Sequence, residues 1–436
     1  MNRKLTPSFL APQKWPFFYG WIILLVGSLG LLMSAPGQTI GVSAFTDPLL
    51  DALGLSRDQL SIAYMIGTMM SAILLTKAGI FFDRFGAMRT ALIASVGMGI
   101  ALLYLSQMGR LSALFGGGVI LTMGLILFGF VFIRFFGQGV LTLASRTMVV
   151  KWFDARRGMA VGILSMITAY GFSMAPVVFN DLIDWNGWSQ AWMLIGVVCI
   201  FIFPIIILLF YKRDPADYGL KPDGFSDKKL AKHQVVRFPI KKEFSLNEAR
   251  KTMSLWVYSG LAALYGLVIT GFTFNVVSIF ATRGLSKEAA FEFFQPIAIV
   301  AIVVTICLSW LSDYIKLKYI AYLFGIAGLV AMYSTVMLGK DALHYWLLVG
   351  SFGTCSGIHP LILTLFLPRF FGKQHLGAIT GQAMTLVVFS SAIGPVLFSQ
   401  SLTLTGSYNG SAYICGFVFL GLLIAALFTR NPQEEI

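Results

Sequence analysis

Long apolar stretches separated by short polar segments run along the whole 436-residue chain. A membrane-spanning helix needs about 20 consecutive, mostly apolar residues. These stretches are continuous rather than alternating, which argues against a membrane β-barrel. They lie at residues 17–45, 58–80, 88–108, 114–148, 158–180, 189–211, 253–280, 289–311, 317–338, 342–368, 376–402 and 409–429. The pattern therefore predicts an all-α membrane protein with twelve transmembrane helices.

Two of the stretches are unusual in length or position. The fourth, 114–148, is too long for one straight span, so we expect a bend near Gly137 and Gly139 or an extension beyond the bilayer. The first could be mistaken for a secretion signal. Its apolar run is too long for one, and Pro36 follows the residues where cleavage would fall, so we interpret it as a retained span.

A polar segment divides the chain into two parts. Between Tyr211 and Thr252 the hydrophobicity falls and eleven basic residues accumulate together with several prolines and glycines. This composition is typical of a linker. We therefore predict an N-terminal six-helix half at 1–211, a cytoplasmic linker at 212–252 and a C-terminal six-helix half at 253–436.

The two halves share short motifs in the same order. Segment 54–58 (Gly-Leu-Ser-Arg-Asp) recurs as 284–288 (Gly-Leu-Ser-Lys-Glu), 230 residues later, and Asp83 is matched by Asp313 at the same offset. At offsets of 218 to 219, Phe153, Gly158, Gly162 and Pro176 correspond to Phe371, Gly377, Gly381 and Pro395. Such a duplication predicts two pseudo-symmetric bundles related by an axis along the membrane normal, with a solute site between them near the midplane.

The composition agrees with a chain that lies in lipid. It is 57% hydrophobic and 12% charged, with a mean hydropathy of +0.80, which excludes an ordinary soluble protein. Of the 32 Lys and Arg residues, 24 fall on the side of the two termini, five on the other side and three inside spans. This positive-inside bias places both termini in the cytoplasm, predicts a multi-pass protein of the cytoplasmic membrane and explains the +13 charge without nucleic acid. The short outer loops favour a monomer.

The loop after the second span carries the sharpest motif. Residues 79–89 read Gly-Ile-Phe-Phe-Asp-Arg-Phe-Gly-Ala-Met-Arg. Simple anchoring at the membrane face would require neither the carboxylate of Asp83 nor glycines at fixed spacing. A carboxylate at a helix end can pair with arginine or with the N-terminus of a neighbouring helix. The segment resembles the G-x-x-x-D-R-x-G signature of the major facilitator superfamily, and the repeat and the linker agree with it.

This resemblance implies alternating access controlled by a gating latch of charged residues at helix ends. The latch would contain Asp83, Arg84, Arg89 and Asp313. Met88 stands at a position that is usually basic, and the second copy, residues 310–314, lacks the leading glycine.

Arg134 is the most informative charge inside a span. An arginine at the centre of a membrane helix costs about 2.5 to 3.5 kcal/mol on insertion scales, so its environment must compensate it. Residues 134–139 (Arg-Phe-Phe-Gly-Gln-Gly) resemble the arginine-and-glycine signature of fourth spans in many facilitators, which implies a role in proton or substrate coupling. The alternative is a structural arginine bonded to helix-end carbonyls.

Other polar residues lie within the predicted spans. With Arg134, the candidates for substrate binding or coupling are Gln38, Thr39, Gln138, Tyr170, Asn275, His359 and Gln382. Each of these seven could instead join helices by hydrogen bonds. His359 is the deeply placed group whose ordinary pKa is near neutrality, so it is a candidate proton carrier, with a packing histidine as the alternative.

Three further motifs resemble those of one branch of this superfamily. Residues 19–21, 151–158 and 213–224 are similar to those of the monocarboxylate and oxalate-formate carrier branch. This resemblance implies a small organic anion, often moved with a proton or exchanged for another anion. Such carriers usually hold the carboxylate with a cation in span eight or eleven, and neither span contains Arg or Lys here. Anion binding would then depend on Arg134 or on helix N-termini.

The sequence therefore predicts secondary active transport of a monocarboxylate-like anion by alternating access, coupled to protons. The alternative is a proton-driven efflux antiporter for hydrophobic or drug-like compounds, whose span-five signature would be reduced to Gly171 and Ala175-Pro176. A membrane enzyme is not expected, because no nucleophile or metal-ligand cluster is found. No nucleotide-binding loop or added sensor domain is present, and we expect no metal and no cofactor.

Overall fold

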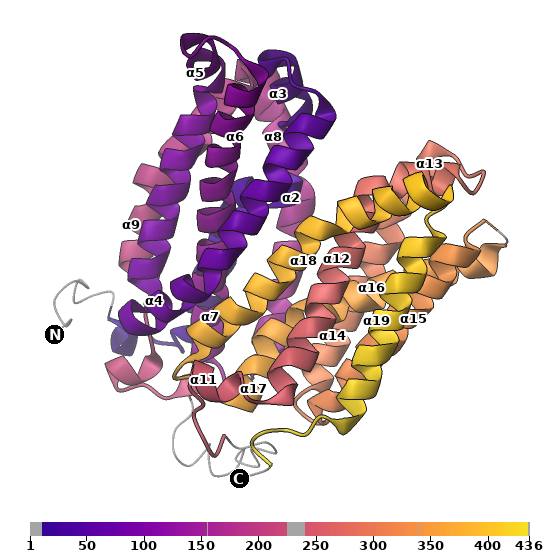
Figure 1. Ribbon diagram of the computed structural model, residues 1–436. Coiled ribbons are helices and arrows are strands. Elements are labelled where there is room, and N and C mark those ends of the chain that lie inside the picture. Colours follow the sequence, from indigo (N-terminus) through magenta and orange to yellow (C-terminus); the bar gives the residue numbers. More distant parts are fainter. Residues whose placement is uncertain (1–10, 155, 225–239, 340, 435–436) are drawn as a thin grey trace. The chain divides into compact units, whose positions relative to one another are not determined.

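The computed structural model describes residues 11–154, 156–224, 240–339 and 341–434 (Figure 1). Contacts divide the chain into two compact units. Unit 1 is Met1–Arg156 with Met166–Val235, and unit 2 is Arg157–Ser165 with Val236–Ile436. Residues 225–239 of the predicted linker lie outside the described residues. The described parts contain helices and turns but no β-strand.

Unit 1 is built from long helices joined by short ones. Its elements are η2 (Pro12–Lys14), α1 (Gly20–Met33), η3 (Ala35–Gly37), α2 (Thr39–Ser43), α3 (Thr46–Leu53), α4 (Arg57–Ser106), α5 (Met108–Leu114), α6 (Val119–Ile133), η4 (Arg134–Leu141), α7 (Thr142–Trp152), α8 (Arg157–Val197), η5 (Val198–Ile202), α9 (Phe203–Phe210), η6 (Pro215–Tyr218) and η7 (Pro222–Gly224). The first residues of α8 belong to unit 2. Helix α4 packs against α6 and η4, and α1 packs against α7.

Unit 2 repeats this construction. Its elements are α11 (Leu246–Ala249), α12 (Met253–Ala281), α13 (Lys287–Glu292), α14 (Phe294–Leu311), α15 (Leu317–Met337), α16 (Ala342–Leu361), η8 (Ile362–Phe366), α17 (Leu367–Phe371), α18 (Leu376–Thr405) and α19 (Asn409–Phe428). Helix α12 packs along α18, α14 along α16, and α15 against both α16 and α19. We call the end of each unit that the linker joins its linker end.

The number of spans agrees with the prediction. Ten helical segments among the described residues are long and apolar enough to cross a membrane. Helices α4 and α8 each break at a glycine with positive φ, Gly86 (82°) and Gly187 (80°). Dividing both helices there gives twelve segments. Large apolar side chains remain exposed on them, including Ile120 (89%) and Phe417 (74%), as lipid-facing positions require. The predicted helical membrane fold is confirmed.

Local signals explain where the repeated helices begin. Gly54 (φ 61°) and Gly284 (φ 73°) both adopt the left-handed conformation that favours glycine. Two residues later, the hydroxyl of Ser56 accepts a hydrogen bond from the Gln59 amide at 3.2 Å, and that of Ser286 accepts one from the Ala289 amide at 3.2 Å. The repeated sequence thus ends one helix and caps the next in both units.

Candidate functional site

Arg134 is the first residue of η4, a π-helical segment that continues α6, and its side chain is only 2% exposed. Its Nε donates to the Thr68 hydroxyl at 3.1 Å. Its Nη1 donates to the Gly37 carbonyl at 3.0 Å and to the Thr39 hydroxyl at 3.3 Å. The guanidinium carbon lies 4.9 Å from the centre of the Tyr64 ring. Three segments of unit 1 therefore converge on this one cation.

Glycines make this convergence possible. A Cβ added at Gly137 would lie 2.8 Å from the Gly37 Cα, and one added at Gly37 would lie 2.8 Å from the Gly137 Cα. Real Cβ atoms do not approach other atoms so closely, so two glycines are needed where η3 crosses η4. The approach brings the Gly37 carbonyl within reach of Arg134. The irregularity predicted near Gly137 and Gly139 is thus a π-helical segment, a feature often found at functional sites.

The partners of Arg134 among the described residues are all neutral: two hydroxyls, one carbonyl and one aromatic ring. The Tyr64 hydroxyl also donates to Thr39 at 3.0 Å, and Thr68 donates to the Tyr64 carbonyl at 2.8 Å, so the acceptors are themselves fixed. Hydrogen bonds orient the guanidinium without neutralising it. A buried cation in this state attracts an anion strongly, because the low local dielectric weakens screening.

Of the other candidates in unit 1, Thr39 binds Arg134 directly. Gln38 donates to the hydroxyls of Ser34 at 3.0 Å and Thr142 at 3.2 Å, and so joins the start of α2 to α7. The Gln138 Oε1 is buried and accepts no hydrogen bond from the described residues. Tyr170, on α8, is 69% exposed.

The candidates in unit 2 lie apart from one another. Asn275 donates to the Gly271 carbonyl of its own helix at 2.9 Å and accepts from Ser399 at 3.2 Å, and so joins α12 to α18. The His359 ring lies 5.5 Å from the Tyr265 ring. Gln382, near the start of α18, accepts from Arg250 Nε at 3.1 Å and therefore lies at the linker end.

The predicted latch residues of unit 1 surround Gly86. The carbonyl of Asp83 accepts from Arg213 Nη2 at 2.8 Å. Gly86 has a φ of 82°, a conformation that favours glycine, and a Cβ there would also lie 3.0 Å from the Arg213 side chain. Arg84 is exposed and stacks over Phe85 at 5.2 Å, and Arg89 is also exposed.

Asp313 forms an ion pair at the linker end of unit 2. Its Oδ1 lies 3.5 Å from Arg369 Nη2, and Arg369 Nη1 donates to the Ser312 carbonyl at 2.6 Å. Gly158, at the start of α8, packs so closely on α14 that an added Cβ would clash with the Ser309 carbonyl. Sequence reasoning missed Arg369, although it lies 218 residues after Lys151, the offset of the neighbouring phenylalanines. Its position in the repeat was therefore an available signal.

The carboxylates of Asp223 and Glu243, both within the predicted linker, each bind the loop that follows the fourth span of a unit. Asp223 accepts from the amides of Asp154 at 3.0 Å and Arg156 at 3.1 Å. Glu243 Oε2 accepts from the amides of Lys373 at 2.6 Å and Gln374 at 2.8 Å. We call these the loop clamps. They were not predicted, because a carboxylate that binds backbone amides leaves no motif in the loop.

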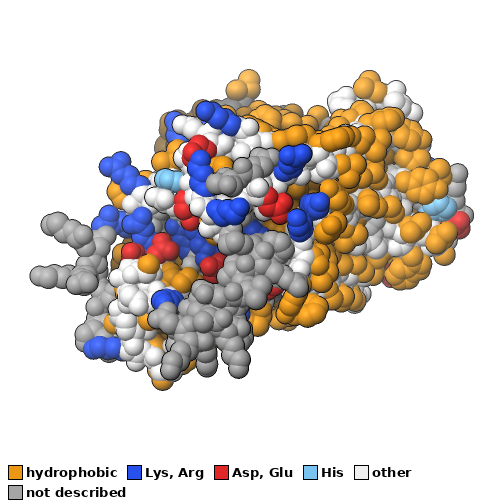
Figure 2. Space-filling model, turned by 90° about the horizontal axis from the view of Figure 1, so that it is seen from below, with side chains coloured by type: hydrophobic (Ala, Val, Ile, Leu, Met, Phe, Trp, Pro, Cys, Tyr) orange, Lys and Arg blue, Asp and Glu red, His pale blue; other side chains and the backbone are white. Residues whose placement is uncertain are grey.

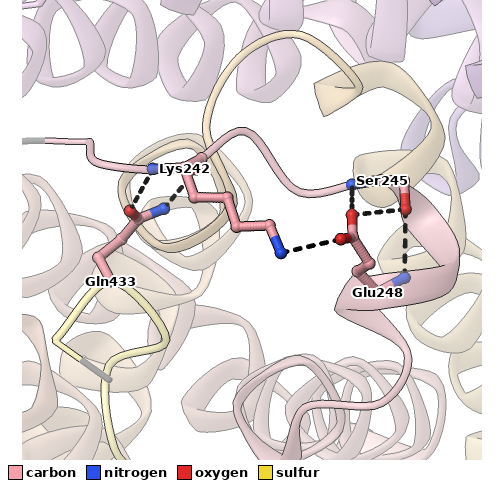
Figure 3. A network of polar contacts seen from close by, with 4 residues as sticks. All are labelled: Lys242, Ser245, Glu248 and Gln433. Carbon is pink, nitrogen blue, oxygen red and sulfur yellow. Dashed lines mark hydrogen bonds and ion pairs between the residues drawn. The ribbon is translucent and has the colours of Figure 1, made fainter. Parts of the chain in front are cut away.

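A second polar network ties the linker to the C-terminal tail (Figure 3). Gln433, 3% exposed, accepts from the Lys241 and Lys242 amides at 2.8 and 3.0 Å, and donates to the Lys242 and Phe370 carbonyls at 2.8 and 2.9 Å. Lys242 also lies 2.9 Å from Glu248, and its hydrogen bond lowers the pKa of Glu248 to about 2. The tail is thereby held at a defined place on unit 2.

Twelve apolar helical segments in two units, with an oriented guanidinium buried in one of them, define a polytopic membrane protein of the transporter class. The chain belongs to the Major Facilitator Superfamily, whose family model matches residues 27–395. The protein is accordingly a transporter and not an enzyme.

Two named relatives and one solved structure resemble this chain over most of its length. Monocarboxylate transporter 12 of Rattus norvegicus is 24% identical over 360 residues, covering 73% of this chain and 72% of that protein. The oxalate:formate antiporter of Oxalobacter formigenes is 21% identical over 449 residues, covering 95% and 96%. The human organic anion transporter MFSD10 has the same fold, with a TM-score of 0.64 at 13% identity over 93% of this chain and 99% of its own. The resemblance to the monocarboxylate and oxalate-formate branch is confirmed.

Proposed function

We propose that the protein is a secondary active transporter that moves a small, monocarboxylate-like organic anion by alternating access, and that Arg134 binds the anion. The neutral environment of Arg134 is the observation that carries this proposal. The names of the two relatives, which refer to monocarboxylate and to oxalate and formate, support it.

The chemistry of the site fits a carboxylate. Guanidinium groups bind carboxylates through charge-assisted hydrogen bonds, often in pairs. Nε and Nη1 of Arg134 are used by the protein, whereas Nη2 makes no hydrogen bond to the described residues. An anion at Nη2 would supply the counter-charge that the site lacks. Gln138, whose Oε1 has no hydrogen-bond partner among the described residues, is the nearby amide that we assign to the same site.

We further propose proton coupling, with His359 as the proton carrier. Histidine is the side chain whose ordinary pKa lies near neutrality, and His359 lies beside Tyr265 inside unit 2. The latch role of Asp83, Arg84, Arg89 and Asp313 belongs to the same proposal. So do the halves 1–211 and 253–436, cytoplasmic termini, a location in the cytoplasmic membrane and a monomeric state, all of which follow from the sequence pattern.

The test is uptake into proteoliposomes of labelled lactate, formate, oxalate, a sugar and a lipophilic cation, with and without acid outside. We expect carboxylate uptake that rises on acidification. Arg134→Gln should reduce it at least about tenfold, because one charge-assisted hydrogen bond contributes about 1.5 to 3 kcal/mol. Arg146→Gln is the matched control, since it removes the same charge from the same apolar stretch at a position outside the Arg134 network.

Arg134→Lys separates anion binding from folding, because lysine keeps the positive charge but lacks the paired N–H donors of the guanidinium group. It should retain part of the uptake with a raised KM. Full uptake by Arg134→Gln at normal membrane levels would contradict the role of Arg134. Proton-driven movement of the lipophilic cation without carboxylate flux would instead assign the protein to the efflux alternative.

A further inference from the structure

A basic cavity lies at the linker end of unit 2. It has a volume of about 310 Å³, room for roughly ten waters at about 30 Å³ each. Among the described residues, four cations line it, Lys316, Lys318, Arg369 and Arg430, together with the carboxylate of Glu434. Figure 2 shows Lys and Arg side chains gathered on the face viewed from below, beside broad hydrophobic surfaces. The cavity is thus electropositive and separate from the Arg134 site.

The cavity lies where membrane-spanning helices begin and end. Lys316 precedes the first residue of α15, whereas Leu427 and Phe428 are the last two residues of α19. These two apolar side chains line the cavity and are 58% and 74% exposed. A cationic space bordered by exposed apolar side chains at a helix end is suited to a ligand with a charged head and an apolar tail.

The backbone adds to the attraction for an anion. The N-terminus of α15, a 21-residue helix, lies at the cavity, and its N-cap residue Lys316 provides no side-chain hydrogen bond to it. Helix N-termini carry partial positive charge and amides that can bind phosphate. Lys316 is held by Glu434 at 3.1 Å, and both side chains are about half exposed. That ion pair is therefore open to competition.

The tail forms a fixed wall of the cavity. Gln433 is buried and makes four hydrogen bonds to the linker and to Phe370. Figure 3 shows those to Lys242. The Arg430 carbonyl accepts from Ser254 at 2.7 Å. These contacts fix the backbone at Arg430 and the side chain of Gln433, the residue before Glu434. The cavity is consequently preformed, which lowers the entropic cost of binding.

We propose that this cavity binds the phosphate of an anionic phospholipid headgroup. Lys316, Lys318 and Arg430 surround the phosphate, and the acyl chains lie along Leu427 and Phe428. Glu434 competes with the lipid for Lys316. This lipid site does not depend on the transported anion, so the proposal stays valid whichever substrate the transporter carries.

The test uses the full chain in phosphatidylcholine nanodiscs with and without phosphatidylglycerol. Native mass spectrometry then measures the lipid that stays bound after release. We expect Lys316→Gln and Arg430→Gln each to lower phosphatidylglycerol retention about fivefold, the attraction of one basic residue for an anionic surface. Glu434→Gln should raise it about fivefold. Lys251→Gln, which removes an exposed basic residue outside the cavity at the same end, should leave retention unchanged.

Two kinds of outcome would overturn the proposal, and the first concerns whether the lipid binds at a defined site. Equal losses of phosphatidylglycerol retention in Lys251→Gln and Lys316→Gln would indicate diffuse electrostatic attraction rather than a defined site. So would unchanged retention in Glu434→Gln, a variant that removes a carboxylate and no cation. The second concerns the source of the phosphate. Phosphatidylglycerol should raise the unfolding temperature more than soluble glycerol phosphate or inorganic phosphate, and equal stabilisation by either soluble ion would contradict a lipid ligand.

Discussion

Replacing Gly137 with alanine would insert a methyl group into the backbone contact that holds Gly37 beside Arg134. The new Cβ would lie 2.8 Å from the Gly37 Cα and 2.8 Å from the Met98 sulfur. Carbon atoms in good contact lie about 3.5 to 4.0 Å apart. The two segments must therefore separate by about 0.7 Å or more.

This separation is enough to break a hydrogen bond of the site. The Arg134 Nη1 to Gly37 oxygen distance is 3.0 Å, and a shift of about 0.7 Å along it exceeds the usual limit of about 3.2 Å. Overpacking of this kind costs about 1 to 3 kcal/mol, whereas alanine gains about 1 kcal/mol over glycine from helix propensity. Arg134 would lose a partner while remaining buried.

Gly124→Ala is the matched control for this change. Gly124 lies in α6, the helix that leads into η4, and nothing lies within 4 Å of an added Cβ. It should therefore show the gain in helix propensity alone, so the difference between the two variants isolates the clash at about 1 to 3 kcal/mol. Thermal unfolding of the purified protein and carboxylate uptake measure the two effects. A Gly137→Ala protein as stable as Gly124→Ala, with full uptake, would show that the contact between Gly37 and Gly137 does not position Arg134.

Two other predictions concern the linker. Asp223→Asn keeps the size of the side chain but leaves one oxygen to accept from two amides. Hydrogen exchange at the Asp154 and Arg156 amides should therefore accelerate about tenfold or more. As a control, Asp217→Asn, in an exposed turn of the linker, should not change this exchange rate. Burial lowers the pKa of Lys212 from 10.5 to about 8. Between these two pH values the unfolded chain binds more protons than the folded chain. The free energy of unfolding of the wild-type protein should therefore rise with pH relative to that of Lys212→Met. A difference in unfolding free energy between the two proteins that stays constant across this pH window would contradict the prediction.

Features set by local sequence could be predicted well. Apolar length gave the spans, because a helix in lipid must satisfy its backbone internally and keep apolar side chains outside. The repeat of Gly54 and Ser56 at Gly284 and Ser286 predicted matching structure, since a left-handed glycine and a hydroxyl cap act over a few residues. The fourth stretch was too long for one straight span, and the bend considered near Gly137 and Gly139 coincides with the π-helical segment.

Features that depend on how helices meet could not be read in this way. Arg134 was identifiable as a charge in need of partners, but Gly37 and Thr68 lie 97 and 66 residues away along the chain. Their approach depends on a glycine contact between two segments. Depth within a span was equally hidden: Gln382 lies in the span Leu376–Thr405 as expected, but it is bound by Arg250 near the linker end of that span. Hydropathy locates a span but does not fix which residues meet a neighbouring helix.

The duplication itself indicates why Arg134 is present. Arg134 precedes Phe153 by 19 residues, and Phe352 precedes Phe371 by the same number. Phe352 is fully buried in an aromatic cluster, with its ring 4.7 Å from that of Phe272 and 6.1 Å from that of Phe293. The repeated scaffold is therefore filled by apolar packing at this position in unit 2. The corresponding position of unit 2 holds no charge, and this supports our proposal that the buried guanidinium of unit 1 binds a ligand.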